Sequence, residues 1–261
     1  MKLRTVPRCT LVKILATISI TLMGASYAGA TVFWDDEMEP GNTGYQIISG
    51  AMAYDHTIKF SGSASVKYTY GPECLEDLDS VCGGFIDRNF PPTASFYRRF
   101  YIRLSAGFQV SNVFTKIMRS DTTGPNSNWW MMGCCGSRSF LVTDQNVPTI
   151  GDAVNHVSSF SLGDTQWYCV ETYEQLNTPG VANGIARAWV NGTQVMNVTN
   201  IMYRQSGDNT LFMNNRMYRQ SGVGNIWYDK VAAGDTRIGC TGPAQNAVSV
   251  PPATPTGLTV R

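Results

Sequence analysis

One segment of the sequence alternates two kinds of side chain with a period of two. Residues 96–104 read FYRRFYIRL, and a β-strand with this period places the phenylalanines, Arg98, Ile102 and Leu104 on one face, which we expect to point to the core. The opposite face carries Tyr97, Arg99, Tyr101 and Arg103. Tyrosine rings stack on sugars, and guanidinium groups pair bidentately with carboxylates. This face therefore predicts a binding surface for an acidic polysaccharide; the alternative is a solvated face whose arginines pair with acidic neighbours.

Two further predicted strands add residues to this surface. The segment 113–118 follows next in the chain, so we expect it to lie beside 96–104 and to add Lys116 or the following Arg119 to the same basic surface. In the segment 167–176, Tyr173 shares a face with Trp167, Cys169 and Glu171. The predicted substrate-binding residues are Tyr97, Arg99, Tyr101, Arg103, Lys116 and Tyr173.

The same surface contains residue types that can cleave a uronate polymer by β-elimination. That reaction needs a base to take the proton beside the carboxylate and a cation to stabilise the charge that develops. Tyr101, Lys116 and His156 are the candidate catalytic residues, although His156 has an ordinary solvated histidine as its alternative.

Glycoside hydrolysis is disfavoured by the spacing of the carboxylates. It needs two carboxyl groups about 5–9.5 Å apart across one sugar bond. Glu171 and Glu174 are three residues apart on one predicted strand, so their side chains point to opposite faces.

The first thirty residues have the composition of a secretory signal peptide. A basic start is followed by the mostly apolar stretch 14–23 and by small residues ending at Ala30. Four of the 20 basic residues and none of the 19 acidic residues lie in residues 1–30, so the mature chain carries a net charge of −3. That balance argues against a nucleic-acid-binding protein, and no later apolar run is long enough to span a membrane. We expect a secreted protein, extracellular or periplasmic, and the sequence leaves its oligomeric state open.

Six of the seven cysteines remain after removal of this segment, an even number that predicts disulfides in an oxidising compartment. Cys74 and Cys82 are close enough in sequence to close one loop. Cys134 and Cys135 either bridge each other or reach separate partners, for which Cys169 and Cys240 are the candidates. A zinc–thiolate site is the alternative, but the chain has no C-x-x-C spacing.

Alternation elsewhere predicts an all-β fold. Residues 64–70 alternate apolar and polar side chains, and Asn191-Gly192 between two short strands is typical of a type I′ hairpin. We expect the other strands at 96–104, 113–118, 140–143, 167–176 and 226–231. No segment keeps a capped helical period, so we predict one antiparallel β-sandwich, a jelly roll, over residues 31–240. Residues 241–261 predict a Pro/Thr-rich linker or the start of a truncated fibronectin type III-like module.

The hexapeptide MYRQSG occurs twice, at 202–207 and at 217–222. A spacing of this size is too short for a solenoid repeat. Two neighbouring loops or strands of one sheet explain the repeat; a functional alternative is a pair of Tyr-Arg-Gln arms at a binding site.

Three separated segments resemble the concanavalin A-like jelly rolls, most closely the polysaccharide-lyase-type and laminin G-like modules. Residues 36–41 and 60–66 are similar to their opening strands, and IWYDKV at 226–231 is similar to their closing strand. Residues 167–192 are similar to the W-x-x-x-E, N-T-P-G and W-V-N-G stretch of lyase-like jelly rolls. The lyase motifs R-x-E-x-R, Q-I-H and Y-F-K-A-G-x-Y-N-Q are absent, so the resemblance implies the fold but transfers no catalytic residue.

The resemblance also implies a metal site. Glu39 and Asp229 match positions where related binding modules often hold a structural calcium ion, and two surface carboxylates are the alternative. No other cofactor is expected. The sequence thus predicts a secreted jelly-roll domain that binds an acidic polysaccharide and, if it is an enzyme, acts as a lyase. The alternative is a noncatalytic carbohydrate-binding or adhesion module of a larger extracellular protein.

Overall fold

The computed structural model describes residues 31–41, 46–47, 52–75, 82, 84–112, 114–124, 127–133, 137–144 and 154–240. The predicted signal peptide over 1–30, Cys134, Cys135 and the tail over 241–261 lie outside the described residues. The side chains of residues 127–129 and 218–220 lie outside them as well.

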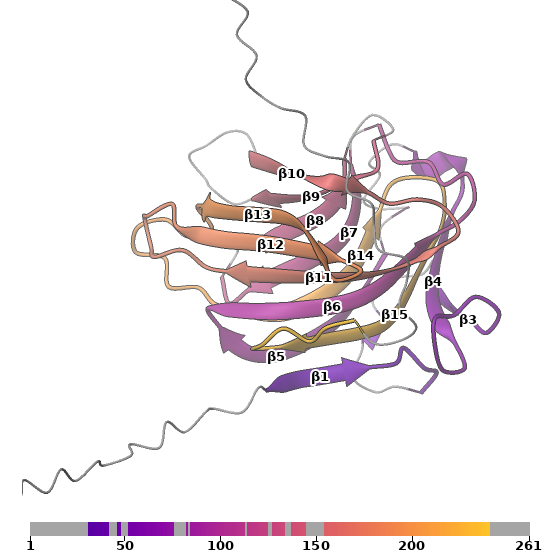
Figure 1. The fold of residues 1–261 in the computed structure, drawn as a ribbon, viewed down its shortest axis with the longest axis horizontal. Helices are drawn as coiled ribbons and strands as arrows, with labels where there is room; N and C mark the ends of the chain where they lie inside the picture. Colours follow the sequence, from indigo (N-terminus) through magenta and orange to yellow (C-terminus); the bar gives the residue numbers. More distant parts are fainter. Residues whose placement is uncertain are drawn as a thin grey trace, which may run out of the picture.

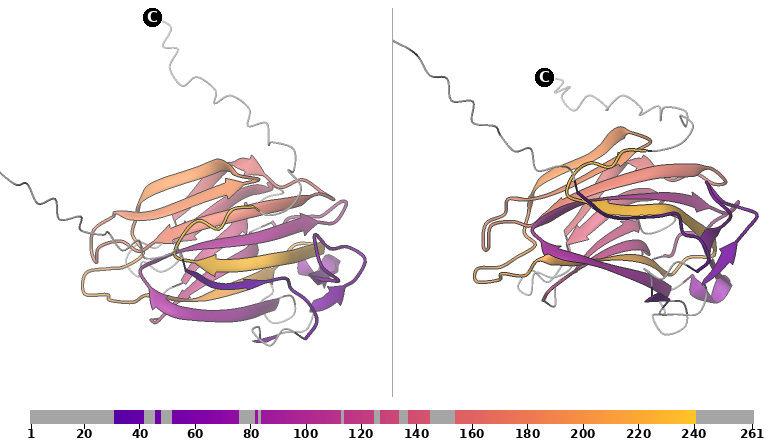
Figure 2. Two further views of the ribbon diagram at one scale, coloured as in Figure 1. Left: turned by 60° about the horizontal axis from the view of Figure 1, so that its bottom comes forward. Right: turned by 90° about the horizontal axis from the view of Figure 1, so that it is seen from below.

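Two antiparallel sheets stacked face to face make up the molecule (Figures 1 and 2). The eight-stranded sheet has the strand order β13 (Thr193–Ile201), β12 (Gly184–Val190), β11 (Trp167–Gln175), β6 (Ser95–Leu104), β15 (Gly224–Gly234), β4 (Ser65–Tyr70) and β3 (Met52–Asp55), with β1 (Val32–Asp36) also paired to β15. The seven-stranded sheet has the order β10 (Val154–Ser161), β9 (Ser139–Asp144), β8 (Ser127–Met132), β7 (Thr115–Thr122), β14 (Phe212–Gln220), β5 (Gly84–Thr93) and β2 (Gln46–Ile47). A short 3₁₀ helix lies at Pro72–Cys74.

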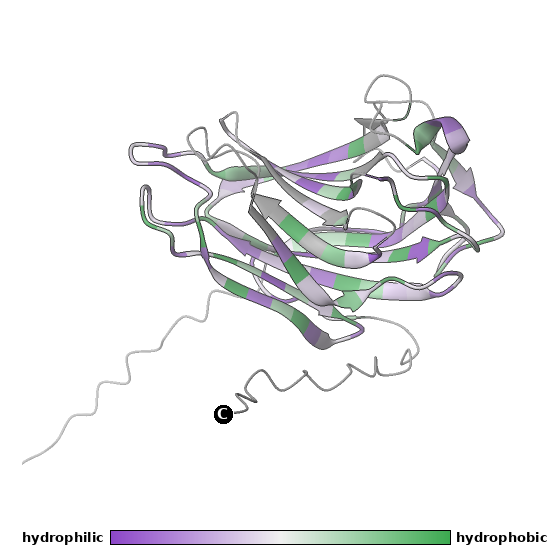
Figure 3. Cartoon of the chain, turned by 90° about the horizontal axis from the view of Figure 1, so that it is seen from above, coloured by the Kyte–Doolittle hydropathy of each residue, from purple (hydrophilic) through white to green (hydrophobic). Residues whose placement is uncertain are grey.

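The predicted antiparallel β-sandwich is confirmed. Along many strands, hydrophobic and hydrophilic residues alternate, as expected for sheets with one face in a core (Figure 3). The predicted apolar face of residues 64–70 is buried: Ala64, which precedes β4, and Val66, Tyr68 and Tyr70 within it. The described part of the chain contains no helix long and apolar enough to cross a membrane.

The first and last strands of the sandwich lie side by side. Asp36 at the end of β1 is opposite Val231 on β15 in an antiparallel pairing. The opening and closing segments that carry the family resemblance are therefore neighbours in space. Asp36 is buried, which raises the pKa of its carboxyl, and it forms an ion pair of 2.8 Å with Arg88.

A charged pair lies in the core of the described residues. The expected inward face of β6 is buried, including Arg98. Arg98 lies 3.0 Å from Glu174 of β11, and both side chains are fully buried. The same oxygen of Glu174 accepts hydrogen bonds from the Ser120 hydroxyl at 2.7 Å and the Trp130 indole at 2.8 Å. Glu174 thus joins the two sheets through residues of β7 and β8.

The predicted hairpin is confirmed at Asn191-Gly192, which joins β12 to β13. Their φ angles are 48° and 83°, the positive values that a type I′ turn requires. The Asn191 side chain also accepts a hydrogen bond from the backbone of Cys169 at 3.0 Å.

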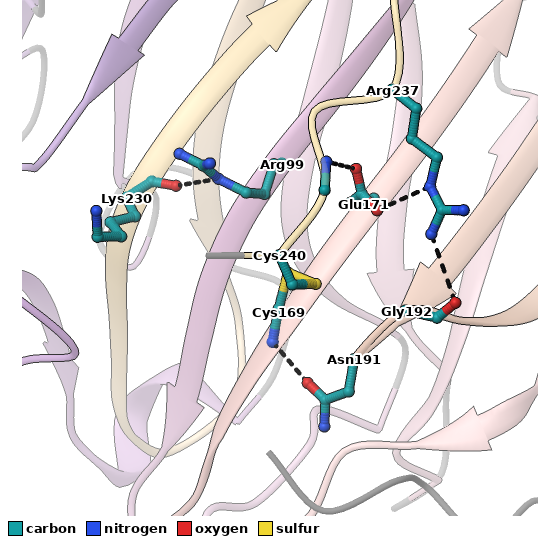
Figure 4. Close-up of a disulfide and its surroundings, with 9 residues drawn as sticks. Arg99, Cys169, Glu171, Asn191, Gly192, Lys230, Arg237 and Cys240 are labelled. Carbon is teal, nitrogen blue, oxygen red and sulfur yellow. Dashed lines mark hydrogen bonds and ion pairs between the residues drawn. A yellow bond between two sulfur atoms is a disulfide. The ribbon is translucent and has the colours of Figure 1, made fainter. Parts of the chain in front are cut away.

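One disulfide prediction is confirmed, and one of the two alternatives for Cys134 and Cys135 is excluded. Cys74 and Cys82 are bonded, as their spacing indicates. Cys169 and Cys240 are bonded to each other, so they cannot serve as separate partners for Cys134 and Cys135. The reason is that the chain after β15 returns across β11 and brings Cys240 to the outward-facing Cys169 (Figure 4).

Candidate functional site

Tyr97, Arg99, Tyr101 and Arg103 of β6 lie on the outer face of the eight-stranded sheet, together with Tyr173. The register pairs Tyr97 with Tyr173, Arg99 with Glu171 and Arg103 with Trp167. Because directly paired residues point to the same face, the predicted shared face is confirmed. Glu174 occupies the opposite, core face, as the odd spacing from Glu171 indicates.

The middle of this face is covered, so two predicted ligand contacts are corrected. Arg99 is 1% exposed; it pairs with Asp35 at 2.6 Å and donates to the carbonyl of Lys230 at 3.2 Å. Tyr101 is also 1% exposed, and its ring stacks on Phe60 with centroids 3.8 Å apart. The covering residues come from β1 and from the turn before β4, and the alternation within β6 carries no information about them.

The other end of the outer face is more open. Tyr97, Tyr173 and Trp189 are half-buried rings on β6, β11 and β12. The ring centroids of Tyr97 and Tyr173 are 4.5 Å apart, and those of Tyr97 and Trp189 are 6.3 Å apart. We call these three rings with Arg187 and Arg237 the aromatic platform. Arg103, by contrast, lies near the opposite end of β6 and is half-buried.

Lys116 and His156 lie in the other sheet, which corrects the expectation that Lys116 joins the surface of β6. Strand β7, which carries Lys116, pairs with β8 and β14 and not with β6. His156 is on the edge strand β10, opposite the buried Val142, so it lies on the inner side of the sheet. Burial lowers the pKa of His156, which leaves the imidazole neutral at pH 7.

A row of charged residues crosses the outer face of the seven-stranded sheet. Asp87 of β5, Arg216 of β14 and Arg119 of β7 are successive register partners. Arg216 holds Asp87 with two bonds of 2.5 and 2.7 Å and lies 3.4 Å from Asp121. Arg119 pairs with Asp121 as well. We call Asp87, Arg119, Asp121 and Arg216 the charged row.

Lys116 lies on the same face as the charged row. It is three residues before Arg119, a spacing that would normally reverse the face, but the pairing with β8 shifts by one residue between Lys116 and Met118. Lys116 and Arg119 are both half-buried, while the two residues between them are fully buried. This face therefore presents three cations and two carboxylates.

Sequence analysis did not predict the charged row. Arg216, Asp87 and Asp121 come from three separate strands, and only the pairing of β5, β14 and β7 brings them together. The available signal was the second copy of the repeat, since Arg216 directly precedes it on β14.

The two copies of the repeat have different structures. In the first copy, Tyr203 is buried and the Arg204 side chain donates to the carbonyls of Asn177 and Thr210. These residues anchor the turn after β13. The second copy begins on β14, in the middle of the other sheet. The two copies are therefore not neighbouring, equivalent arms.

The two predicted calcium ligands contact the same turn. Asp229 accepts hydrogen bonds from the backbone of Phe60 at 2.7 Å and Ser61 at 3.2 Å, and Glu39 accepts one from Ser63 at 2.7 Å. No group of three or more His, Cys, Asp or Glu residues that could hold a metal occurs among the residues that the structure describes. In this structure the two carboxylates therefore accept hydrogen bonds from the backbone N–H groups of the turn.

Asp229 makes stability depend on pH. Burial raises the pKa of its carboxyl to about 6, although three backbone N–H groups act in the opposite direction. The folded state then binds a proton more tightly than the unfolded state does, so the stabilisation is complete below pH 4 and is lost as the pH rises through 6.

Thermal melts in the presence of a chelator test this dependence. The free energy of unfolding of the wild type minus that of Asp229→Asn should fall by about 2 kcal/mol from pH 4.5 to 7.5. A difference between the two proteins that does not change with pH would contradict this account. Stabilisation of the wild type alone by calcium at pH 7.5 would support the predicted ion instead.

Comparisons with known proteins agree with the fold. Residues 135–215 match the model of the polysaccharide lyase 14 family. This segment runs from before β9 into β14 and includes His156, Tyr173 and Trp189. No curated protein matches the chain.

Three solved structures of lyases share the jelly-roll architecture. The endo-β-1,4-glucuronan lyase of the fungus Trichoderma reesei matches with a TM-score of 0.61 and 15% identity over 79% of this chain and 96% of its own. The alginate lyase vAL-1 from Chlorella virus matches with 0.55 and 14% over 74% and 93%, and the marine PL-14 alginate lyase from Aplysia kurodai with 0.59 and 9% over 78% and 99%. The chain thus has the fold of polysaccharide-lyase-type jelly rolls, as its motifs predict.

Proposed function

We propose that this chain is a secreted lyase-type domain that binds an acidic, uronate-containing polysaccharide and cleaves it by β-elimination. The observation that carries the proposal is the match of residues 135–215 to the polysaccharide lyase 14 model in a chain with the same architecture as known lyases. The two disulfides support an oxidising compartment, and hence export.

The charged row is the place where we locate the reaction. A uronate carboxylate can pair with the guanidinium groups of Arg216 and Arg119, which Asp87 and Asp121 hold in position. The bound carboxylate withdraws electron density from the neighbouring carbon, and its negative charge increases when that carbon loses its proton. Fixed guanidinium groups stabilise this developing charge without having to reorganise.

Lys116 is the one of the three catalytic candidates that lies on this face, and we assign proton transfer to it. A base takes the proton from the carbon that bears the carboxylate, and the electron pair forms a carbon–carbon double bond. The glycosidic carbon–oxygen bond breaks, and the departing oxygen takes up a proton. One product ends in an unsaturated uronate and the other in a hydroxyl group, so no water is consumed.

Substitutions on the charged row test this location. Arg216→Gln removes a cation that stabilises the transition state, so we expect kcat/KM on a uronate polymer to fall about 100-fold or more. Lys116→Arg keeps the charge but not a group that can give up its proton, so it should lose activity as fully as Lys116→Met. Initial rates of ultraviolet absorbance from unsaturated products measure both effects.

Arg138→Gln is the matched control, because the partly exposed Arg138 pairs with Asp164 and not with Asp87 or Asp121. It should retain the wild-type rate. Full activity of Arg216→Gln would remove the charged row as the site, and full activity of Lys116→Arg would show that Lys116 acts only through its charge. Melting temperatures should confirm that each variant is folded.

A noncatalytic binding module is the second candidate function. The aromatic platform favours it, because half-buried rings beside guanidinium groups can bind a polysaccharide but include no group assigned to proton transfer. Retention of a polysaccharide without cleavage of any uronate polymer would support this alternative.

A further inference from the structure

The aromatic platform lies on the opposite sheet from the charged row and takes no part in the reaction proposed there. Its three rings come from adjacent strands in register: Tyr97 pairs with Tyr173, and Trp189 pairs with Glu171 one row further along. The planes of Tyr97 and Trp189 are inclined by only 29°, and those of Tyr97 and Tyr173 by 34°. Because the Tyr97 and Tyr173 centroids are only 4.5 Å apart, the rings are stacked against one another, and they form one continuous aromatic ladder across three strands.

The polar edges of two of these rings are available for a ligand. Neither the Tyr97 hydroxyl nor the Trp189 indole N–H makes a hydrogen bond to the described part of the chain, whereas the Tyr173 hydroxyl donates to Gln175 at 2.7 Å. Burial raises the pKa of Tyr97, so its hydroxyl remains a donor at neutral pH. Ring edges that combine apolar carbon with an unpaired polar group match a sugar, which has both kinds of surface.

Two guanidinium groups border the rings. Arg187 lies 5.7 Å from the centre of the Tyr173 ring and is held by Asn197 at 2.9 Å. Arg237 lies 4.6 Å from the centre of the Trp189 ring. The neighbouring carboxylate, Glu171, is only 1% exposed. The platform therefore presents positive charge to solvent.

The disulfide fixes Arg237 at this position (Figure 4). Arg237 donates to Glu171 at 3.0 Å and to the carbonyl of Gly192 at 3.4 Å, and the backbone of Gly239 donates to Glu171 at 2.6 Å. Cys240 then closes the segment onto Cys169. An arginine restrained in this way loses little conformational entropy when it pairs with a ligand.

We infer that the aromatic platform is a second binding site for an acidic polysaccharide, separate from the charged row. The sugars pack against the exposed edges of Tyr97, Tyr173 and Trp189, while Arg187 and Arg237 pair with uronate carboxylates. Charge complementarity selects this occupant over a neutral glycan, because both guanidinium groups lie beside these rings. The site would keep the chain on a polymer independently of cleavage.

Affinity electrophoresis in gels that contain alginate tests this inference, with dextran as the neutral probe. The starting protein should be Arg216→Gln, so that the probe is not degraded during the run. Added to that background, Arg187→Gln and Trp189→Ala should each weaken retention by alginate about tenfold. Lys59→Gln removes the same charge from an exposed residue on the turn before β4, so retention should not change. Dextran should retain none of the proteins.

Three outcomes would overturn the inference: unchanged retention of both platform variants, an equal loss in Lys59→Gln, or equal retention by dextran. Melting temperatures separate loss of binding from loss of fold, and Arg187→Gln leaves the ring packing intact. Because the readout is binding, the test is independent of the proposed reaction. Unsaturated products together with unchanged platform binding would refute the second site alone.

Discussion

Replacing Glu174 by glutamine should destabilise the sandwich by about 3–5 kcal/mol, although glutamate and glutamine side chains have nearly the same shape. Glutamine keeps an oxygen that can accept from Ser120 and Trp130, but it leaves the Arg98 charge buried without its counter-ion. Equilibrium denaturation with urea measures the loss.

The double variant Arg98→Met/Glu174→Gln separates charge from packing. It removes the unpaired cation, so most of the lost stability should return. Glu37→Gln is the control, because the Glu37–Lys230 pair is largely exposed on its acidic side and its loss should cost less than about 1 kcal/mol. A double variant no more stable than Glu174→Gln would show that the unpaired charge of Arg98 does not cause the loss.

Removing the Cys169–Cys240 disulfide should have the second largest effect. The bond joins residues 71 positions apart, so its loss releases a long loop in the unfolded chain and should cost about 4 kcal/mol. The variant Cys169→Ala/Cys240→Ala also frees the segment that holds Arg237 over Trp189.

The Cys74–Cys82 disulfide provides the comparison, since it joins residues only eight positions apart. Its removal should cost about 2–3 kcal/mol by the same chain-entropy relation. The larger loss should therefore occur for Cys169→Ala/Cys240→Ala in urea denaturation. The reverse order would mean that local packing, and not loop closure, governs the contribution of these bonds.

Local patterns in the sequence predicted the elements of the fold correctly. The period of two in β6 identified both faces of the strand, and the odd spacing of Glu171 and Glu174 identified their opposite orientations. Asn191-Gly192 identified the hairpin. Each of these signals depends only on the local geometry of a few consecutive residues, and a single sequence gives all of those residues.

Properties that depend on distant segments were not predicted. Alternation shows that Arg99 and Tyr101 leave the core, but not that Asp35 and Phe60 cover them. Adjacency in the chain suggested that β7 lies beside β6, whereas the connection crosses to the other sheet and takes Lys116 with it. In a sandwich, consecutive strands can join either sheet, so sequence order alone does not specify neighbours.

The candidate site was found only in part for the same reason. Tyr97 and Tyr173 were expected on one surface and do meet there. Trp189 was noted only in a hairpin and in the W-V-N-G motif, and the charged row depends on the pairing of β5, β14 and β7. A binding surface assembled from several strands needs the strand order, which a single sequence does not provide.

The central claim, cleavage by β-elimination, is tested most directly by counting the ends that each cut produces. The purified protein should be incubated with alginate and with polyglucuronate, and both the unsaturated ends, by ultraviolet absorbance, and the new reducing ends should be counted. We predict one unsaturated end for every new reducing end on at least one of these polymers, and about 100-fold fewer of both in the same time with Arg216→Gln. New reducing ends without absorbance would mean hydrolysis, and the absence of either product on both polymers would contradict the proposed reaction.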